Sequence, residues 1–295
     1  MSENFGRELS ARGWRRMARH QPREAAAGKP IDGPDVRYII AVGSGKGGVG
    51  KSTVSLNLAL ALAQRGLAVG LLDADLYGPN IPLMVGLVRS KWGEDWTIAQ
   101  RNQQVKIPTV ERFGLKIMSA GFLVGEDQPL ADASLVRLLA QQFMWHVDWG
   151  KLDFLIIDLP PGTADAQQVF ARSVPLAGAV LVVTPQDVAH LDAKKAVQMY
   201  RRSQIPILGG IENMSGLICP DCGKRIDIFP RVREERSIWA MGIDKLGEIP
   251  LDPAVSTAGD TGHPLLITQP DSTQATAFRQ IAEKLVTRLE NEHSH

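Results

Sequence analysis

The chain has 295 residues, of which 44% are hydrophobic and 22% are charged, and its formal net charge at pH 7 is +1. This size predicts a sizeable core, and the small net charge gives no reason to expect a nucleic acid partner. No apolar run approaches the roughly 20 residues that cross a bilayer, and the N-terminus lacks the apolar stretch of a signal peptide. We therefore expect a cytoplasmic protein without a membrane span.

The first 36 residues differ from the rest, with seven Lys and Arg, five Asp and Glu, and increasing Pro and Gly. We expect a basic, flexible N-terminal tail at 1–36 and a single domain at 37–295. The alternatives for the tail are a partner-binding or membrane-surface arm and an organelle transit peptide, which the acidic residues fit poorly.

From Tyr38 onward, apolar runs of strand length alternate with longer helical stretches. The predicted strands are apolar without interruption, which is typical of strands buried on both faces; they cover 38–43, 67–73, 152–158, 178–184 and 207–213. The predicted helices cover 52–65, 135–147, 189–203 and 273–292. This order predicts an α/β fold with a doubly wound, mostly parallel sheet and helices on both faces.

A phosphate-binding loop follows the first predicted strand. Its pattern, G-x-x-x-x-G-K-S/T with one further Thr, is formed by Gly45, Lys46, Gly47, Gly48, Val49, Gly50, Lys51, Ser52 and Thr53. Glycines let backbone N–H groups converge on phosphate oxygens, and the following helix adds positive potential at its N-terminus. Lys51 supplies a full positive charge, and Ser52 supplies a hydroxyl ligand for Mg²⁺. The loop predicts ATP binding.

The same glycines allow a second interpretation. Gly45, Gly47 and Gly50 also satisfy the dinucleotide fingerprint, with Asp73 at the end of the next predicted strand as the ribose partner. That pattern would indicate a hydride-transfer enzyme. The pair Lys51 and Ser52 favours the nucleotide triphosphatase, because a dinucleotide site uses neither an ammonium group nor a Mg²⁺-binding hydroxyl there.

Aspartates follow two other predicted strands. Asp73 and Asp75 come after 67–73, and Asp158 ends 152–158 ahead of a Pro-Pro-Gly loop. A strand-end Asp suits the residue that holds Mg²⁺ through a water, which we assign to Asp158. Asp75 is the candidate for positioning the attacking water, and Asp165 lies in a loop that could respond to the γ-phosphate.

Cys219 and Cys222 are the only cysteines, and two residues separate them. Two thiols are half of a closed four-thiolate site. An iron–sulfur cluster, a structural zinc, a redox dithiol and two incidental thiols all remain open on this spacing.

Seven motifs in order resemble the Mrp/ApbC family of iron–sulfur cluster carriers: SGKGGVGKST, DADLYGPNIP, DLPPGTAD, TPQDVA, ENMS, CPDCG and GEIPLDP. This family belongs to the deviant phosphate-loop ATPases, with the nitrogenase iron protein and the Min-type ATPases. The resemblance runs from about Tyr38 to the C-terminus.

The resemblance implies further site residues. Lys46 matches the signature lysine that reaches a partner's nucleotide, and Asp75 matches the first switch residue. Asp158 and the stretch 162–165 match the Walker B and second switch regions. Asn213, Pro250 and Asp252 match positions around adenine.

The resemblance also implies that Cys219 and Cys222 bind one [4Fe–4S] cluster across a homodimer, since two chains supply four thiolates. The implied function is ATP-dependent cluster assembly and transfer, with slow ATP hydrolysis, cluster donors and apo-protein clients. The alternative is a regulatory or positioning ATPase with structural Zn²⁺ at the dimer interface.

Two segments depart from the family pattern. Asp127–Pro129 lacks the usual Trp-Arg-Gly-Pro after it, and 230–239 (PRVREERSIW) replaces a glycine-rich turn. We expect 233–236 to be a solvated helical face, His190 to be a surface or capping residue, and the cluster Trp145, His146 and Trp149 to pack in the core.

Overall fold

The computed structural model describes residues 34–75, 78–87, 99–101, 104–122, 142–162, 165–219 and 221–292. The predicted tail up to residue 33, the segment 127–129 and the first part of the predicted helix 135–147 lie outside the described residues. Within the described part of that helix, residues 142–145 are helical.

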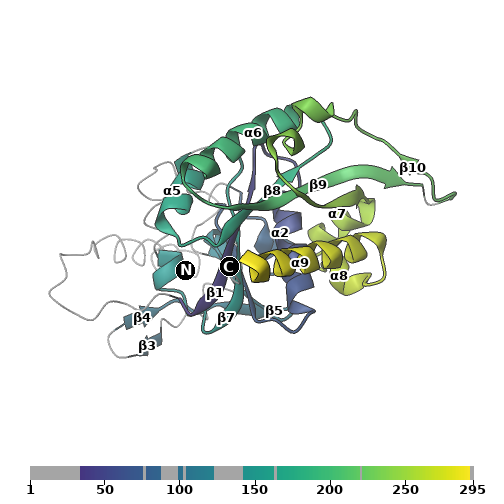
Figure 1. The fold of residues 1–295 in the computed structure, drawn as a ribbon. Coiled ribbons are helices and arrows are strands. Elements are labelled where there is room, and N and C mark those ends of the chain that lie inside the picture. Colours follow the sequence, from purple (N-terminus) through teal and green to yellow (C-terminus); the bar gives the residue numbers. More distant parts are fainter. Residues whose placement is uncertain are drawn as a thin grey trace, which may run out of the picture.

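A mostly parallel sheet forms the centre of the molecule (Figure 1). In the described part of the chain it has nine strands in the order β10-β9-β8-β1-β7-β2-β6-β5, and β11 pairs with β9. The strands are β1 (Val36–Ser44), β2 (Val69–Asp73), β5 (Val110–Arg112), β6 (Leu115–Ser119), β7 (Leu152–Asp158), β8 (Gly178–Val183), β9 (Ile207–Ile218), β10 (Arg225–Ile226) and β11 (Lys245–Leu251). A separate two-stranded sheet pairs β3 (Ala99–Arg101) with β4 (Gln104–Lys106).

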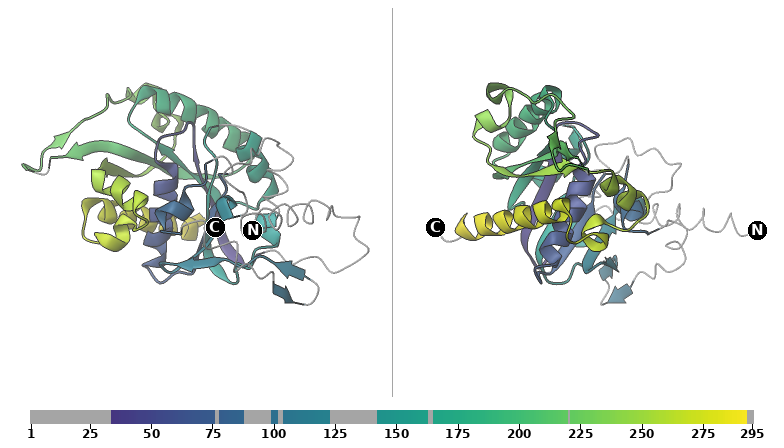
Figure 2. Two further views of the ribbon diagram at one scale, coloured as in Figure 1. Left: turned by 180° about the vertical axis from the view of Figure 1, so that it is seen from behind. Right: turned by 90° about the vertical axis from the view of Figure 1, so that its right-hand side faces the viewer.

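Helices cover both faces of the sheet, as predicted (Figure 2). The helices are α2 (Lys51–Ala63), α3 (Ile81–Met84), α5 (Asp165–Ser173), α6 (Asp187–Arg202), α7 (Pro253–Asp260), α8 (Leu265–Thr268) and α9 (Thr273–Glu292). Short 3-10 turns are η2 (Ala120–Phe122), η3 (Glu234–Arg236) and η4 (Trp239–Met241).

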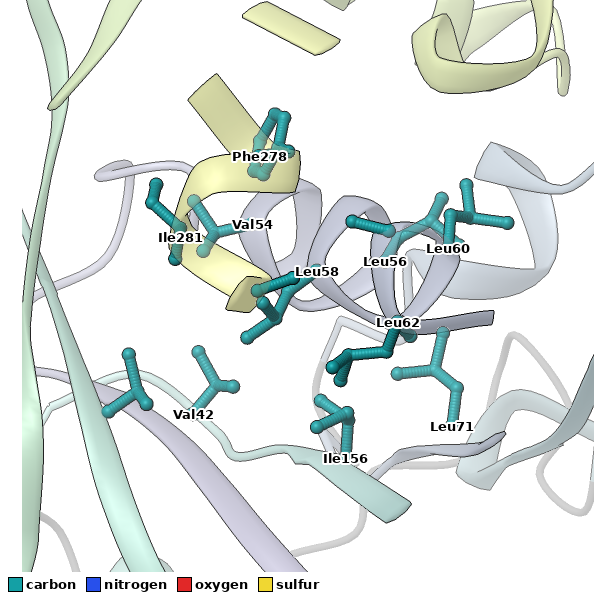
Figure 3. Close-up of a cluster of buried hydrophobic side chains, with 14 of the residues drawn as sticks. Val42, Val54, Leu56, Leu58, Leu60, Leu62, Leu71, Ile156, Phe278 and Ile281 are labelled. Atoms are coloured by element: carbon teal, nitrogen blue, oxygen red, sulfur yellow. The ribbon is translucent and has the colours of Figure 1, made fainter. Parts of the chain in front are cut away.

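Burial alternates along the central strands and divides the core into two layers. In β1, Ile39 and Ala41 pack into the layer of α5 and α6, whereas Ile40 and Val42 pack into the layer of α2 and α9. Helix α2 is buried all round from Val54 to Leu62, because the sheet lies beneath it and α9 covers it (Figure 3). This burial fixes the helix that follows the phosphate loop.

The strand register brings the predicted site residues to one edge of the sheet. Asp158 in β7 lies opposite Val42 in β1 and opposite Asp73 in β2, and Asp73 lies opposite Ser119 in β6. Parallel strands present their carboxyl ends at the same edge, where ligands of such sheets bind.

Candidate functional site: a phosphate loop and a cysteine hairpin

The phosphate loop turns sharply from β1 into α2. Gly48 and Gly50 have φ values of 79° and 81°, which L residues with side chains rarely adopt. A Cβ on Gly50 would also lie 2.3 Å from Nδ2 of Asn213, which donates a hydrogen bond of 2.9 Å to the carbonyl of Val49. Helix α2 begins without a side-chain cap, so its first N–H groups suit phosphate oxygens.

Lys51 and Asp158 form a buried ion pair at the end of this loop. Lys51 Nζ lies 2.8 Å from Asp158 Oδ1, and the two side chains are 6% and 0% exposed. The hydroxyl of Ser55 donates a second hydrogen bond of 2.7 Å to the same oxygen. Sequence reasoning missed Ser55, although its place one helical turn after Lys51 puts it on the same face of α2.

The other carboxylate oxygen of Asp158, Oδ2, is buried and has no hydrogen bond partner in the described residues. Since Oδ1 is occupied by Lys51 and Ser55, Oδ2 is the oxygen that suits a ligand or its water shell. A buried carboxylate oxygen without a protein partner is chemistry that fits Mg²⁺ or its water shell.

Asp73 is fully buried beside Asp158. It accepts hydrogen bonds from the Ser119 hydroxyl at 2.9 Å and from the backbone N–H groups of Asp75 and Ile81 at 3.2 Å each. Burial, and next the negative charge of Asp158, raise the pKa of Asp73 to about 8. Asp73 therefore fixes both ends of the loop that contains Asp75.

Asp75 itself is 7% exposed, and its Oδ1 accepts the N–H of Gly78 at 3.2 Å. Residues 76–77 of this loop lie outside the described residues. Further along the chain, Asp165 begins α5 and Gly162 has a φ of 87°. The structure describes no side-chain placement for Asp165.

Gln167 is a second polar residue that sequence reasoning missed. It is fully buried, and its Nε2 donates to the carbonyls of Pro160 at 2.7 Å and of Ser44 at 3.3 Å. It thus ties the loop after β7 and the start of α5 to the strand before the phosphate loop. Only the tertiary fold brings 44, 160 and 167 together.

Lys46 lies half-buried in the phosphate loop, next to the exposed Gly47 and Gly48. Its carbonyl accepts the hydroxyl of Ser44 at 2.9 Å, and its ammonium group has no partner among the described residues.

The three residues expected around adenine lie on two neighbouring strands and the loop after them. Asn213 in β9 pairs with Ile249 in β11, directly before Pro250. Asp252 caps α7, since its Oδ1 accepts the N–H of Ala254 at 2.8 Å. The structure therefore gives Asp252 a helix-capping role.

Cys219 and Cys222 lie in the turn between β9 and β10, which we call the cysteine hairpin (217–226) and which projects from the body of the fold (Figure 1). Hydrogen bonds of 2.9 Å from Cys219 N to Lys224 O and from Gly223 N to Cys219 O close the turn. Both thiols are free; Cys219 is partly exposed and Cys222 is exposed.

Hydrogen bonds from the backbone N–H groups of Cys222 and Asp221, together with the Cys222 thiol, lower the pKa of the Cys219 thiol. A lowered pKa favours the thiolate, which is the form that binds metals. The described residues contain no cluster of three or more His, Cys, Asp and Glu side chains that could hold a metal. The two thiols of the hairpin are ligands of the kind that metals and iron–sulfur clusters bind.

Of the two positions expected for His190, at the surface or as a capping residue, the surface position is wrong. His190 is fully buried rather than at the surface, because it lies on the buried face of α6 and packs against Ile238, directly before η4. Its Nδ1 accepts the N–H of Ile238 at 3.2 Å, and its ring meets Trp239 edge to face. Trp149 is buried as expected, Trp145 packs against the same core cluster, and residues 233–236 are exposed.

The comparisons with known proteins agree with this geometry. The family model of the NUBPL iron-transfer P-loop NTPases, within ParA, matches residues 35–286. The chain belongs to this family. Its membership and its nucleotide-bound structural neighbours place it among the nucleotide-binding P-loop hydrolases, and they confirm the predicted fold class and resemblance.

Two relatives show how far the similarity extends. An iron–sulfur cluster carrier protein of Aquifex aeolicus is 49% identical over 261 residues, which cover 88% of this chain and 70% of the relative. The iron–sulfur cluster transfer protein NUBPL of Mus musculus is 41% identical over 282 residues, covering 93% of this chain and 83% of the relative.

Solved structures share the fold. A nucleotide-binding protein of Archaeoglobus fulgidus in complex with ADP aligns with a TM-score of 0.68 and 34% identity over 83% of this chain and 93% of its own. The septum site-determining protein MinD of Pyrococcus horikoshii with Mg-ADP aligns with a TM-score of 0.62 and 26% identity over 84% and 95%. In the described residues, no helix is long and apolar enough to cross a membrane.

Proposed function

We propose that this chain is an ATP-dependent iron–sulfur cluster carrier. Two copies bind one [4Fe–4S] cluster on Cys219 and Cys222 of each chain, receive it from a donor and pass it to apo-proteins. The observation that carries this proposal is the projecting hairpin, whose two free thiols include one with a lowered pKa. The names of the relatives, cluster carrier and cluster transfer protein, support the same cargo.

The nucleotide half of the proposal assigns a role to each residue of the phosphate loop. Backbone N–H groups of 45–53 and the ammonium of Lys51 bind the phosphates. Ser52 and, through a water, Asp158 hold Mg²⁺, which neutralises phosphate charge when bound. Asp75 orients the attacking water, and Lys46 reaches the nucleotide of the partner chain. We assign Asn213, Pro250 and Asp252 to the adenine side and treat 37–295 as one ATPase domain.

Strand β9 provides a physical link between the two sites. Asn213 contacts the phosphate loop through Val49, and Cys219 directly follows the end of the same strand at Ile218. A change of the loop on nucleotide binding therefore acts on the strand that holds the thiols. This supports nucleotide-dependent cluster binding, with slow hydrolysis setting how long each state lasts.

The test is the iron, sulfide and zinc content of protein purified without oxygen, with its absorption spectrum and its size in solution. We expect a brown dimer with about two irons and two sulfides per chain, both lost in Cys219→Ala. Lys51→Ala serves as the matched control, because it should lose ATP hydrolysis and still accept the cluster in vitro.

Other outcomes decide between the alternatives. A colourless dimer with about half a zinc per chain would favour a positioning ATPase with a structural zinc site. A protein that stays without iron after reconstitution would contradict the carrier function. Normal ATP turnover in Lys51→Ala would contradict the assignment of the loop.

A further inference from the structure

The segment after the cysteine hairpin returns across the end of the sheet; we call residues 228–237 the return segment. Val232 N donates to the carbonyl of Pro185, after β8, at 2.8 Å. Arg236 forms an ion pair of 2.7 Å with Asp187, the first residue of α6. The return segment thus fastens the far end of the hairpin to the α6 side of the fold.

Arg231 in this segment forms ion pairs with three acidic side chains near the base of the hairpin. Its guanidinium lies 3.4 Å from Glu212 in β9, 3.5 Å from Asp227 after β10 and 3.8 Å from Glu248 in β11. It also donates a hydrogen bond of 3.0 Å to the carbonyl of Ser215. One side chain therefore connects β9, Asp227 directly after the hairpin, and β11.

Arg225 meets Arg231 at the same carbonyl. Its guanidinium donates to Ser215 O at 2.6 Å and to Glu248 at 3.0 Å. Two cations at one carbonyl repel each other unless acids surround them. The carboxylates of Glu212, Glu248 and Asp227 supply the negative charge that offsets the two guanidinium groups. Lys245 also belongs to this network, with contacts of 3.2 Å to Glu212 and 2.8 Å to Glu248.

The carbonyl that both arginines hold lies in an irregular part of β9. Asn213 pairs with Ile249 and Leu217 pairs with Leu251, so 214–216 lie opposite Pro250 alone. Proline has no N–H to donate to the ladder, and an extra stretch of strand bulges at such a place. Met214 has a φ of 55° and Gly216 a φ of 156°, both outside ordinary strand geometry.

This bulge stands between the two sites of the proposed function. Asn213, which contacts the phosphate loop, precedes it, and Cys219 follows it by three residues. A strand without regular ladder hydrogen bonds does not fix the direction of the hairpin by itself. Its direction then depends on the side chains that hold the bulge.

We propose that Arg231, acting with Arg225, is a positioning residue that clamps the β9 bulge and sets the direction of the cysteine hairpin. The clamp determines where Cys219 and Cys222 point towards the partner chain. This inference rests on the proposed function for its purpose, whereas the clamp itself rests on the contacts above.

The chemistry of the clamp requires arginine. A planar guanidinium presents several N–H groups in fixed directions and can bind a carbonyl and separate carboxylates at once, which an ammonium on a flexible stem does poorly. A pocket of about 450 Å³ lined by Glu212, Arg231, Lys245 and neighbouring residues borders the network, so salt ions reach these charges. The clamp should weaken as salt increases.

The test follows the motion of a nitroxide spin label on Cys222 in the chain without cluster, with Cys219→Ser to leave one thiol. In Arg231→Ala we expect the mobile fraction of the spectrum to rise about twofold or more, and in Arg231→Lys to rise less. Salt at about 1 M, where the screening length is ~3 Å, should shift the unsubstituted chain towards Arg231→Ala.

Arg233→Ala is the matched control, because Arg233 lies two residues further along the return segment, is exposed and forms no ion pair with the described residues. Its spectrum should not change. Glu248→Gln removes the charge of the acidic residue in β11 that contacts both arginines. It should raise the mobility of the spin label even if Arg231→Ala folds poorly. Identical spectra for Arg231→Ala, Glu248→Gln and the unsubstituted chain would overturn the proposal.

The unlabelled variants separate this inference from the proposed function. If the unsubstituted chain holds a cluster, Arg231→Ala should lose iron to a chelator several-fold faster, and an unchanged rate would overturn the role in cluster positioning. If the unsubstituted chain holds no cluster, the carrier function fails, while the spin-label spectra still decide whether the clamp exists.

Discussion

At the scale of single residues, the site depends on how Asp158 divides its two carboxylate oxygens. Oδ1 is occupied by Lys51 and Ser55, whereas Oδ2 is buried without a partner in the described residues. A carboxylate held at one oxygen keeps its other oxygen in a fixed direction. We infer that Ser55 maintains this orientation when Lys51 turns towards phosphate.

Ser55→Ala tests this role. Losing a hydrogen bond to a buried charged group costs about 1.5–3 kcal/mol, so kcat for ATP hydrolysis should fall about 10- to 100-fold. The KM for ATP should change little, because the Ser55 hydroxyl contacts Asp158 and the carbonyl of Lys51 rather than a group we assign to nucleotide binding. Ser55→Thr keeps the hydroxyl and should restore much of the rate.

Asn57→Ala is the control, since Asn57 is a buried polar residue of the same helix whose amide bonds only to Thr53 O among the described residues. Steady-state kinetics at several Mg²⁺ concentrations supply the measurement. Equal rates in Ser55→Ala and the unsubstituted chain would show that Lys51 alone orients Asp158.

At the scale of elements, close packing against α6 positions the phosphate loop. A Cβ on Gly45 would lie 2.2 Å from the backbone N of Ala193 and 2.2 Å from the carbonyl carbon of Asp192. Backbone atoms cannot move aside as a side chain does. The loop and α6 therefore form one packed unit, and Gly45 is required by this contact rather than by a left-handed φ.

Gly45→Ala should destabilise the chain by about 1–3 kcal/mol, because the added methyl group forces the loop away from α6. Gly47→Ala is the matched control in the same loop, since a Cβ there would lie 3.8 Å from Pro161 Cβ, which is ordinary van der Waals contact. Thermal unfolding without nucleotide should show a lower Tm for Gly45→Ala alone. A similar Tm for both variants would contradict rigid packing of the loop on α6.

At the scale of the whole molecule, two buried titratable groups affect stability in opposite directions. Burial, and next the positive charges of Lys245 and Lys194, lower the pKa of His190 to about 4 from 6.5. The unfolded chain then binds this proton first as pH falls. Asp73, whose pKa is raised to about 8 from 3.8, instead contributes stability that is fully present below pH 3.8 and is lost as the pH rises through 8.

His190→Gln isolates the first of these effects. In the unsubstituted chain, the contribution of neutral His190 is fully present above pH 6.5 and is lost as the pH falls towards 4. We expect the stability of His190→Gln to depend less on pH in this interval, as measured by denaturant unfolding. Parallel curves for the two proteins would show that His190 does not titrate as its burial implies.

The sequence by itself determined the fold class, the five central strands and the phosphate loop. Uninterrupted apolar runs such as 178–184 fit only strands covered on both faces, and the loop pattern needs specific residues at fixed spacing. The two cysteines and the ordered motifs also led to the family. These features are local, so the sequence alone reveals them.

Tertiary structure alone decided which distant residues meet. The partnership of Ser55 with Asp158, the bonds of Gln167 to 44 and 160, and the burial of His190 depend on how helices pack on the sheet. The contacts of Arg231 also depend on tertiary structure, because it lies in the segment 230–239, which departs from the family pattern and whose sequence suggests no partner. Such contacts follow from packing and register rather than from spacing along the chain, and no local pattern predicts them.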